Sequence, residues 1–91
     1  MTLREQLSIL DKDTIVRIEN DIYKRFINGF DTIERYIEGK TITNGDTVLD
    51  CLYSDYKLSD NDLNKIVRRI FVDIEDDRPI VIICIKDYIK D

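Results

Sequence analysis

The C-terminal third of the chain reads Ile66-Val-Arg-Arg-Ile-Phe-Val-Asp-Ile-Glu75, then Asp76-Asp-Arg-Pro79, then Ile80-Val-Ile-Ile-Cys-Ile85. In the first segment apolar side chains recur at every second position over much of its length, which favours a strand. The last segment is apolar at every position, which is typical of a central strand buried on both faces. Pro79 fits at the start of that strand, where no ladder hydrogen bond is lost. We therefore predict an antiparallel hairpin with strands at residues 66–75 and 80–86, the second of them central.

The N-terminal segment predicts a short helix followed by a strand. Thr2 and Glu5 have the spacing of a capping box, in which each side chain accepts a hydrogen bond from the other residue's backbone. Leucines recur at helical spacing across residues 3–10, so we expect an amphipathic helix there. Residues 14–19 are rich in β-branched side chains and predict a strand.

Residues 22–38 allow two interpretations. Their apolar side chains fall on one helical stripe, but Asn28-Gly29 in the middle favours a turn. The segment is either one long helix bent at Gly29, or a strand at residues 22–28 followed by a helix at residues 31–38. We favour the second interpretation, because Asp31 can cap such a helix and Gly39 can end it.

The remaining segments predict short elements around the hairpin. Asn44-Gly45-Asp46 predicts a turn, and residues 47–53 a short helix with Val48, Leu49 and Leu52 inward. Ser59 and Asp62 have capping-box spacing at the start of one helical turn, with Leu58 and Leu63 beneath it. The chain is predicted to be one α+β domain, residues 1–91, in which a small antiparallel sheet with a central C-terminal hairpin packs with short helices.

Composition excludes several kinds of chemistry. Histidine is absent from the 91 residues, so Ser–His and Cys–His catalysis and His–metal sites are excluded. The three glycines, at positions 29, 39 and 45, are isolated and form no phosphate-binding loop. We therefore predict a protein that is not an enzyme, with no cofactor and no bound metal.

The charge and hydropathy patterns also bear on partners and location. With a net charge of −5 and no basic block, the chain is not expected to contact nucleic acid directly. It has no apolar signal core, and its longest apolar run, residues 80–85, is far shorter than the ~20 residues of a membrane helix. We expect a cytoplasmic protein that does not contact membranes. Cys51 and Cys84 lack metal-type spacing and are expected to be reduced thiols, with Cys84 in the core.

Three acidic patterns are weak candidates for ion or nuclease sites. Glu38-Gly39-Lys40, with Asp31 upstream, matches the order of residues in metal-dependent nucleases, but we expect the triplet to end a helix. The carboxylates of Asp73, Glu75, Asp76 and Asp77 are dense enough for a weak ion site, and a solvated hairpin tip is the favoured interpretation. Residues 60–64 hold the first oxygen positions of a calcium loop, but Lys65 and Ile66 follow where more ligands are required.

Residues 46–62 form the best candidate for a partner surface, because acidic residues and tyrosines are interleaved there. Carboxylates steer toward a basic partner, and tyrosine gives contact area at low entropic cost. The alternative is an acidic solvated loop. The candidate partner-binding residues are Asp46, Asp50, Tyr53, Asp55, Tyr56, Asp60 and Asp62.

Four segments resemble small acidic accessory proteins of phages and prophages of Gram-positive bacteria. They are Thr2-Leu-Arg-Glu-Gln-Leu7, Asp13-Thr-Ile-Val-Arg-Ile18, Ile70-Phe-Val-Asp-Ile-Glu-Asp-Asp77 and Ile80-Val-Ile-Ile-Cys-Ile85. Some phage proteins of this size and charge are anti-defence factors, including anti-CRISPR proteins that bind and block a host nuclease. The resemblance covers roughly the two ends of the chain and assigns no functional residues.

These observations lead to one functional hypothesis and two alternatives. We expect a non-enzymatic inhibitor from a mobile element that contacts a basic host protein, such as a CRISPR effector, by protein–protein contact or DNA mimicry. The alternatives are a small-ligand binder that sequesters a nucleotide signal, and a structural or assembly factor of a phage particle. We also expect a homodimer, since so many aliphatic side chains on a small domain favour an exposed apolar patch.

Overall fold

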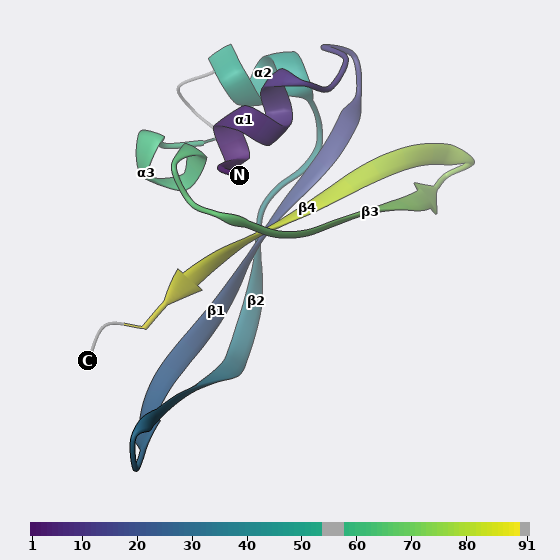
Figure 1. Ribbon diagram of the computed structural model, residues 1–91. Coiled ribbons are helices and arrows are strands. Elements are labelled where there is room, and N and C mark those ends of the chain that lie inside the picture. The colour runs from purple at the N-terminus through teal and green to yellow at the C-terminus, as the bar shows by residue number, and fades with distance from the viewer. Residues whose placement is uncertain (54–57, 90–91) are drawn as a thin grey trace.

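The computed structural model describes residues 1–53 and 58–89 of the chain. Four strands form one mixed sheet in the order β2-β1-β4-β3, in which β1 and β4 are parallel neighbours at the centre (Figure 1). Antiparallel hairpins, β1–β2 and β3–β4, make up its two halves. The elements are α1 (Leu3–Ser8), β1 (Ile15–Asn28), β2 (Asp31–Thr47), α2 (Val48–Tyr53), α3 (Asp60–Leu63), β3 (Val67–Glu75) and β4 (Arg78–Tyr88).

The predicted C-terminal hairpin is confirmed, and β4 is its central strand. Residues 82–85 have no exposed surface, because β4 is paired on both edges and carries apolar side chains toward both faces. The expectation of an antiparallel sheet is wrong in one respect. The two hairpins meet through the parallel pair β1 and β4, so the α+β fold is built on a mixed, strand-rich sheet.

The helix predicted at residues 31–38 is wrong, because this segment is part of β2. A two-residue turn at Gly29 and Phe30 joins β1 to β2, and Gly29 has the positive φ of 66° that such turns favour. The prediction of a strand at residues 22–28 is confirmed as part of β1. Gly39 therefore lies inside a strand and ends no helix.

The turn predicted at residues 44–46 is also wrong, since β2 continues through it to Thr47. The strand pairing shifts by one residue there, so that Val16 pairs with Asp46 and Arg17 with Asn44. Gly45 is the extra residue of this bulge and takes a φ of 83°, which glycine adopts without steric cost.

The short helices form where capping residues predict them. Thr2 and Glu5 make both hydrogen bonds of the capping box of α1, which ends at Ser8. The Ser59 side chain accepts a hydrogen bond from the Asp62 amide and caps α3. In α2 the predicted helix is confirmed, but its fully buried residues are Val48 and Cys51, and Leu49 is exposed.

The core lies between the helices and one face of the sheet. Its buried members are Leu3, Leu7, Val16, Ile18, Val48, Cys51, Leu58, Leu63, Ile83 and Ile85. The three helices gather at one end of an elongated molecule with extents of 48 × 27 × 20 Å (Figure 1). The far half of hairpin β1–β2 projects away from them, and β3 runs along an edge of the sheet.

Candidate binding surfaces

The projecting half of hairpin β1–β2, residues 24–38, is here called the arm. Its cross-strand pair Phe26 and Ile33 lies on one face, and Ile27, with 84% of its surface exposed, lies on the other. Phe30 occupies the second position of the tip turn and is fully exposed. The arm thus presents large apolar side chains on both faces and at its tip, where no element of the described chain covers them.

Ion pairs hold the base of the arm to β4. Glu34 accepts hydrogen bonds from Lys86 Nζ and, at 2.7 Å, from the Tyr88 hydroxyl. The Arg25 guanidinium lies 3.8 Å from the centre of the Tyr88 ring and also pairs with Glu34. The hydrogen bond from Lys86, followed by that from Tyr88, lowers the pKa of Glu34. These contacts fix the direction in which the arm projects.

Strand β3 is a second surface with uncovered apolar side chains. Ile70, Val72 and Ile74 share one face of the strand, and Phe71 lies on the other. All four are exposed, even though each pairs with a residue of the central strand β4. The strand is an edge of the sheet, so among residues 1–53 and 58–89 no strand lies along one side of its backbone.

The helix-free face of the sheet holds a cluster of charged groups around a buried carboxylate. Ligand atoms of Glu19, Asp21 and Cys84 all lie within 4.8 Å of one another, and Asp21 is 1% exposed. Arg68 and Arg69 approach Asp21 Oδ2 at 3.6 and 3.5 Å. A bulge between Val67 and Arg69 explains why two successive arginines reach the same carboxylate.

The chemistry of this cluster is that of a self-neutralising ion-pair network. Burial, with the nearby Asp21 charge, raises the pKa of the Cys84 thiol, which therefore stays protonated and weakly nucleophilic at neutral pH. Arg17 Nε lies 3.2 Å from Glu19, and Arg68 and Arg69 hold Asp21. Two carboxylates and a thiol could ligate a metal ion. Here the arginine guanidinium groups lie beside both carboxylates and supply the positive charge that a metal ion would bring.

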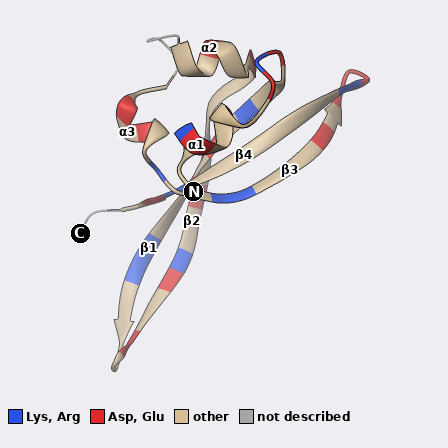
Figure 2. Ribbon diagram, turned by 45° about the horizontal axis from the view of Figure 1, so that its top comes forward, with Lys and Arg blue, Asp and Glu red and all other residues tan. Residues whose placement is uncertain are grey.

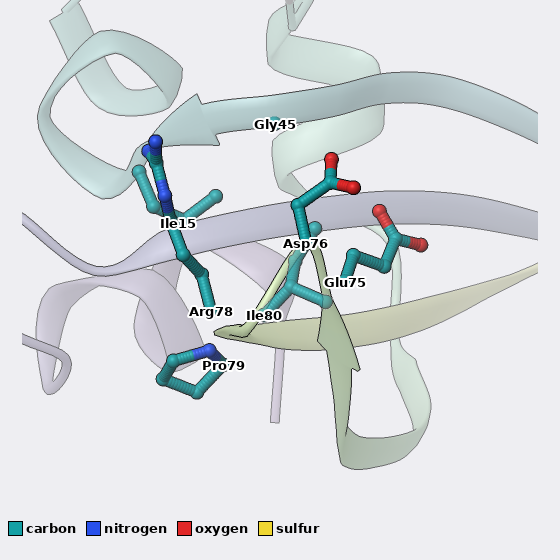
Figure 3. Close-up of a pocket in the computed structure, with 7 residues that line it drawn as sticks. All are labelled: Ile15, Gly45, Glu75, Asp76, Arg78, Pro79 and Ile80. Carbon is teal, nitrogen blue, oxygen red and sulfur yellow. The ribbon is translucent and has the colours of Figure 1, made fainter.

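A shallow groove of about 240 Å³ lies where all four strands come close (Figure 3). Arg78 runs beside Ile15, while the carboxylates of Glu75 and Asp76 reach toward the side where Gly45 lies. Glu75 also pairs with Arg17. The two carboxylates would repel a phosphate group, so this groove does not favour the alternative of a nucleotide ligand.

The predicted acidic surface lies at the helical end of the molecule. Asp46 is near the end of β2 and accepts a hydrogen bond from the Thr43 hydroxyl. Helix α2 carries Asp50 and ends at the exposed Tyr53. Asp55 and Tyr56 fall outside the described residues. On α3, Asp60 pairs with Arg4 at 3.1 Å and Asp62 with Lys65 at 3.0 Å, so cations partly offset two of the predicted carboxylates. The role of this surface remains a prediction.

The nuclease-like triplet does not form a nuclease arrangement. Glu38-Gly39-Lys40 lies in β2 and not at a helix end as expected, and Asp31, the acidic residue of the pattern, lies seven positions earlier at the tip of the arm, opposite Asn28. On the neighbouring strand, Asp21 of β1 pairs with Gly39. A Cβ atom on Gly39 would stand 3.4 Å from Asp21 Oδ1, so Asp21 shares the face of Gly39. Glu38 and Lys40 point to the opposite face of the sheet, so they lie apart from the Asp21 carboxylate.

The weak ion-site candidate at Asp73, Glu75, Asp76 and Asp77 does not bring three of its carboxylates together in the described structure. The only group of three metal-type side chains found there is Glu19, Asp21 and Cys84, which the sequence analysis did not identify. A signal was available, since Arg17, Glu19 and Asp21 alternate along one strand. Their common face becomes meaningful only once β1 is known to lie beside Cys84 of β4.

No family model, curated protein or solved structure matches the chain. No helix in the described part of the chain is long and apolar enough to span a membrane.

Proposed function

We propose that this chain is a non-enzymatic binding protein that acts by protein–protein contact through its arm. The observation that carries the proposal is the exposure of Phe26, Ile27, Phe30 and Ile33 on a projecting hairpin. Exposing such side chains to water is unfavourable by about 25 cal/mol per Å² of apolar surface, which is recovered when a partner covers them. Several large apolar side chains exposed together at one end of a molecule favour an interaction site there.

The tip of the arm supports contact with an apolar cleft. Phe30 stands at the end of a two-residue turn, where a hydrophobic side chain contributes nothing to the core of its own chain. An aromatic ring at such a position can enter a pocket on a partner and act as an anchor. Lys24 and Arg35 lie 5.4 Å from the Phe26 ring centre and would form a polar rim around the contact.

An inhibitor of a host defence nuclease is the specific form of this function that the resemblance to phage accessory proteins supports. The carboxylates at the helical end, Asp50 among them, would steer the chain toward a basic nuclease surface. The arm would then supply the short-range apolar contact. Charge steering and apolar anchoring are compatible, because steering sets the association rate and buried contacts set the dissociation rate.

Affinity capture with matched variants tests the proposal. Ile27→Ser with Phe30→Ser removes apolar surface at the arm tip, and Ile9→Ser is the control at another exposed apolar position, next to α1. We expect the double variant to lose a partner that the wild type and the control retain, and its affinity for that purified partner to fall at least tenfold. Equal affinity of all three chains, or binding to lipid vesicles in place of a protein, would contradict the proposal.

A further inference from the structure

The free edge of β3 is open over a defined length. At its start the edge is covered, because the Val67 amide donates to the Met1 carbonyl at 2.9 Å and Thr2 bridges to Ile66. From residue 68 to Glu75 no described segment pairs with this side of the strand. An unpaired edge of this kind is a template for another strand.

The hairpin turn determines which backbone groups point outward. Asp76 and Asp77, with φ of 51° and 60°, form a two-residue turn, so Glu75 and Arg78 are the pair that closes it. Hydrogen-bonded residues alternate along an antiparallel pair. Phe71, Asp73 and Glu75 therefore bond to β4, while the amide and carbonyl groups of the intervening residues 70, 72 and 74 face outward. The outward amide of Ile74 donates to Asp73 Oδ1 at 2.8 Å, a contact within the strand that a pairing strand would replace.

Charge along β3 is arranged so that the strand complements itself. It begins with Arg68 and Arg69 and ends with Glu75 before the acidic turn, which Figure 2 shows as a blue start and a red end. Between them the strand is apolar except for Asp73, and its apolar residues Ile70, Phe71, Val72 and Ile74 are all exposed. Two such strands placed antiparallel bring the basic start of each against the acidic end of the other.

We propose that β3 pairs with β3 of a second copy of this chain, antiparallel about a two-fold axis at Val72. This register joins outward-facing groups only: Val72 meets Val72 of the second copy, and Ile70 meets its Ile74. On the opposite face Arg69 meets Glu75 of the second copy. The two four-stranded sheets become one continuous sheet of eight strands, and the apolar side chains of one face form an unbroken stripe across the axis.

The other edge of the sheet does not favour the same pairing. Along the arm, β2 carries charges of both signs, and a bulge between the partners of Ile22 and Tyr23 leaves Ile37 unpaired. Bulges and charged side chains are the features by which edge strands avoid pairing. Between Arg69 and Glu75, β3 has no register shift. The difference between the two edges points to β3 as the dimer edge.

Disulfide trapping tests the register. In Val72→Cys the two introduced thiols face each other across the axis with Cα atoms ~5.5 Å apart, within the range that a disulfide spans. In Ile74→Cys the thiols of the two copies stand about four residues apart along the strands, or roughly 13 Å. Ile74 is the more exposed position, 71% against 64%, so random collision would favour its cross-linking. The native Cys51 and Cys84 are buried and do not compete.

We expect Val72→Cys to form a covalent dimer under mild oxidation at least tenfold faster than Ile74→Cys. Equal rates for the two variants, or faster cross-linking of Ile74→Cys, would overturn the proposal.

A second experiment measures molecular mass by sedimentation equilibrium. The wild type and Ile9→Lys should be dimers, and Val72→Lys should be a monomer. A wild-type monomer at 100 μM, about the working range of this method, would equally overturn it. The arm-tip variant Ile27→Ser with Phe30→Ser should remain a dimer, which separates this result from the test of the proposed function.

Discussion

The apolar side chains of strand β1 are buried in its first half and become exposed towards its end. In its first half Val16 and Ile18 are fully buried, whereas in its second half Phe26 and Ile27 are exposed. The second half is no less apolar than the first, and both pair with β2. The three helices explain the difference, because they span only six, six and four residues and gather over one end of the sheet. Burial in this molecule follows the reach of the helices more than the composition of the strand.

The largest expected effect comes from truncating one apolar side chain in each half of hairpin β1–β2. Ile18→Ala should cost about 2–5 kcal/mol of unfolding free energy, because it leaves a cavity in the core. Ile33→Ala should cost about 1 kcal/mol or less, since nearly half of that side chain already meets solvent. Urea unfolding of both variants measures the difference. Similar costs at the two positions would mean that the arm is covered in solution.

The second-largest expected effect is a loss of stability on substitution of Gly29 in the tip turn of the arm. Gly29→Ala should destabilise the protein by about 1–2 kcal/mol, because alanine is strained at a φ of 66°. No atom lies within 4 Å of the added methyl group, so the cost is one of conformation and not of a clash. Thr32→Ala on the same arm serves as the control, with little change expected in urea unfolding. A neutral Gly29→Ala would mean that the turn adopts another conformation in solution.

The smallest expected effect concerns pH at the base of the arm. Glu34 has a pKa below its ordinary value of 4.5, mainly because Lys86 donates to it. A carboxyl whose pKa is lower in the folded than in the unfolded state contributes stability above about pH 4.5, and this is lost as pH falls through the folded pKa. NMR shifts of the Tyr88 ring should therefore change below pH 4.5 in the wild type. The same titration of Glu34→Gln should be flat, and a persisting step would assign it to another group.

Local signals predicted the elements that depend on neighbouring residues. The capping box at Thr2 rests on contacts close in sequence and is confirmed, and Ser59 caps α3 through the Asp62 amide, which is half of the capping box predicted there. The continuous apolar run at residues 80–85 predicted a central strand, and β4 confirms it. The strand at residues 31–38 is predicted as a helix because Phe26, Phe30, Ile33 and Ile37 also have helical spacing. In the structure, the tip turn and the bulge at Ile37 disturb the two-residue alternation that would have identified the strands.

The charged cluster could not be predicted from sequence, because it depends on pairings between distant segments. Asp21 meets Arg68 and Arg69 only because β1 lies beside β4 and β4 beside β3. The parallel register that aligns Glu19 with Cys84 joins residues 65 positions apart. The acidic helical end was proposed from residues close in sequence, which is why its described members still lie in one region of the fold.

Hydrogen–deuterium exchange with the purified partner most directly tests whether the arm is the working surface. In the free protein, amides of residues 16–18 should exchange slowly and those of residues 26–33 faster, as burial of the two halves of the hairpin indicates. On addition of the captured partner we predict new protection across residues 24–38 and little change at residues 48–53 and 58–63. Protection confined to residues 48–53 and 58–63, with the arm unchanged, would contradict the proposal and make the acidic helical end the binding surface.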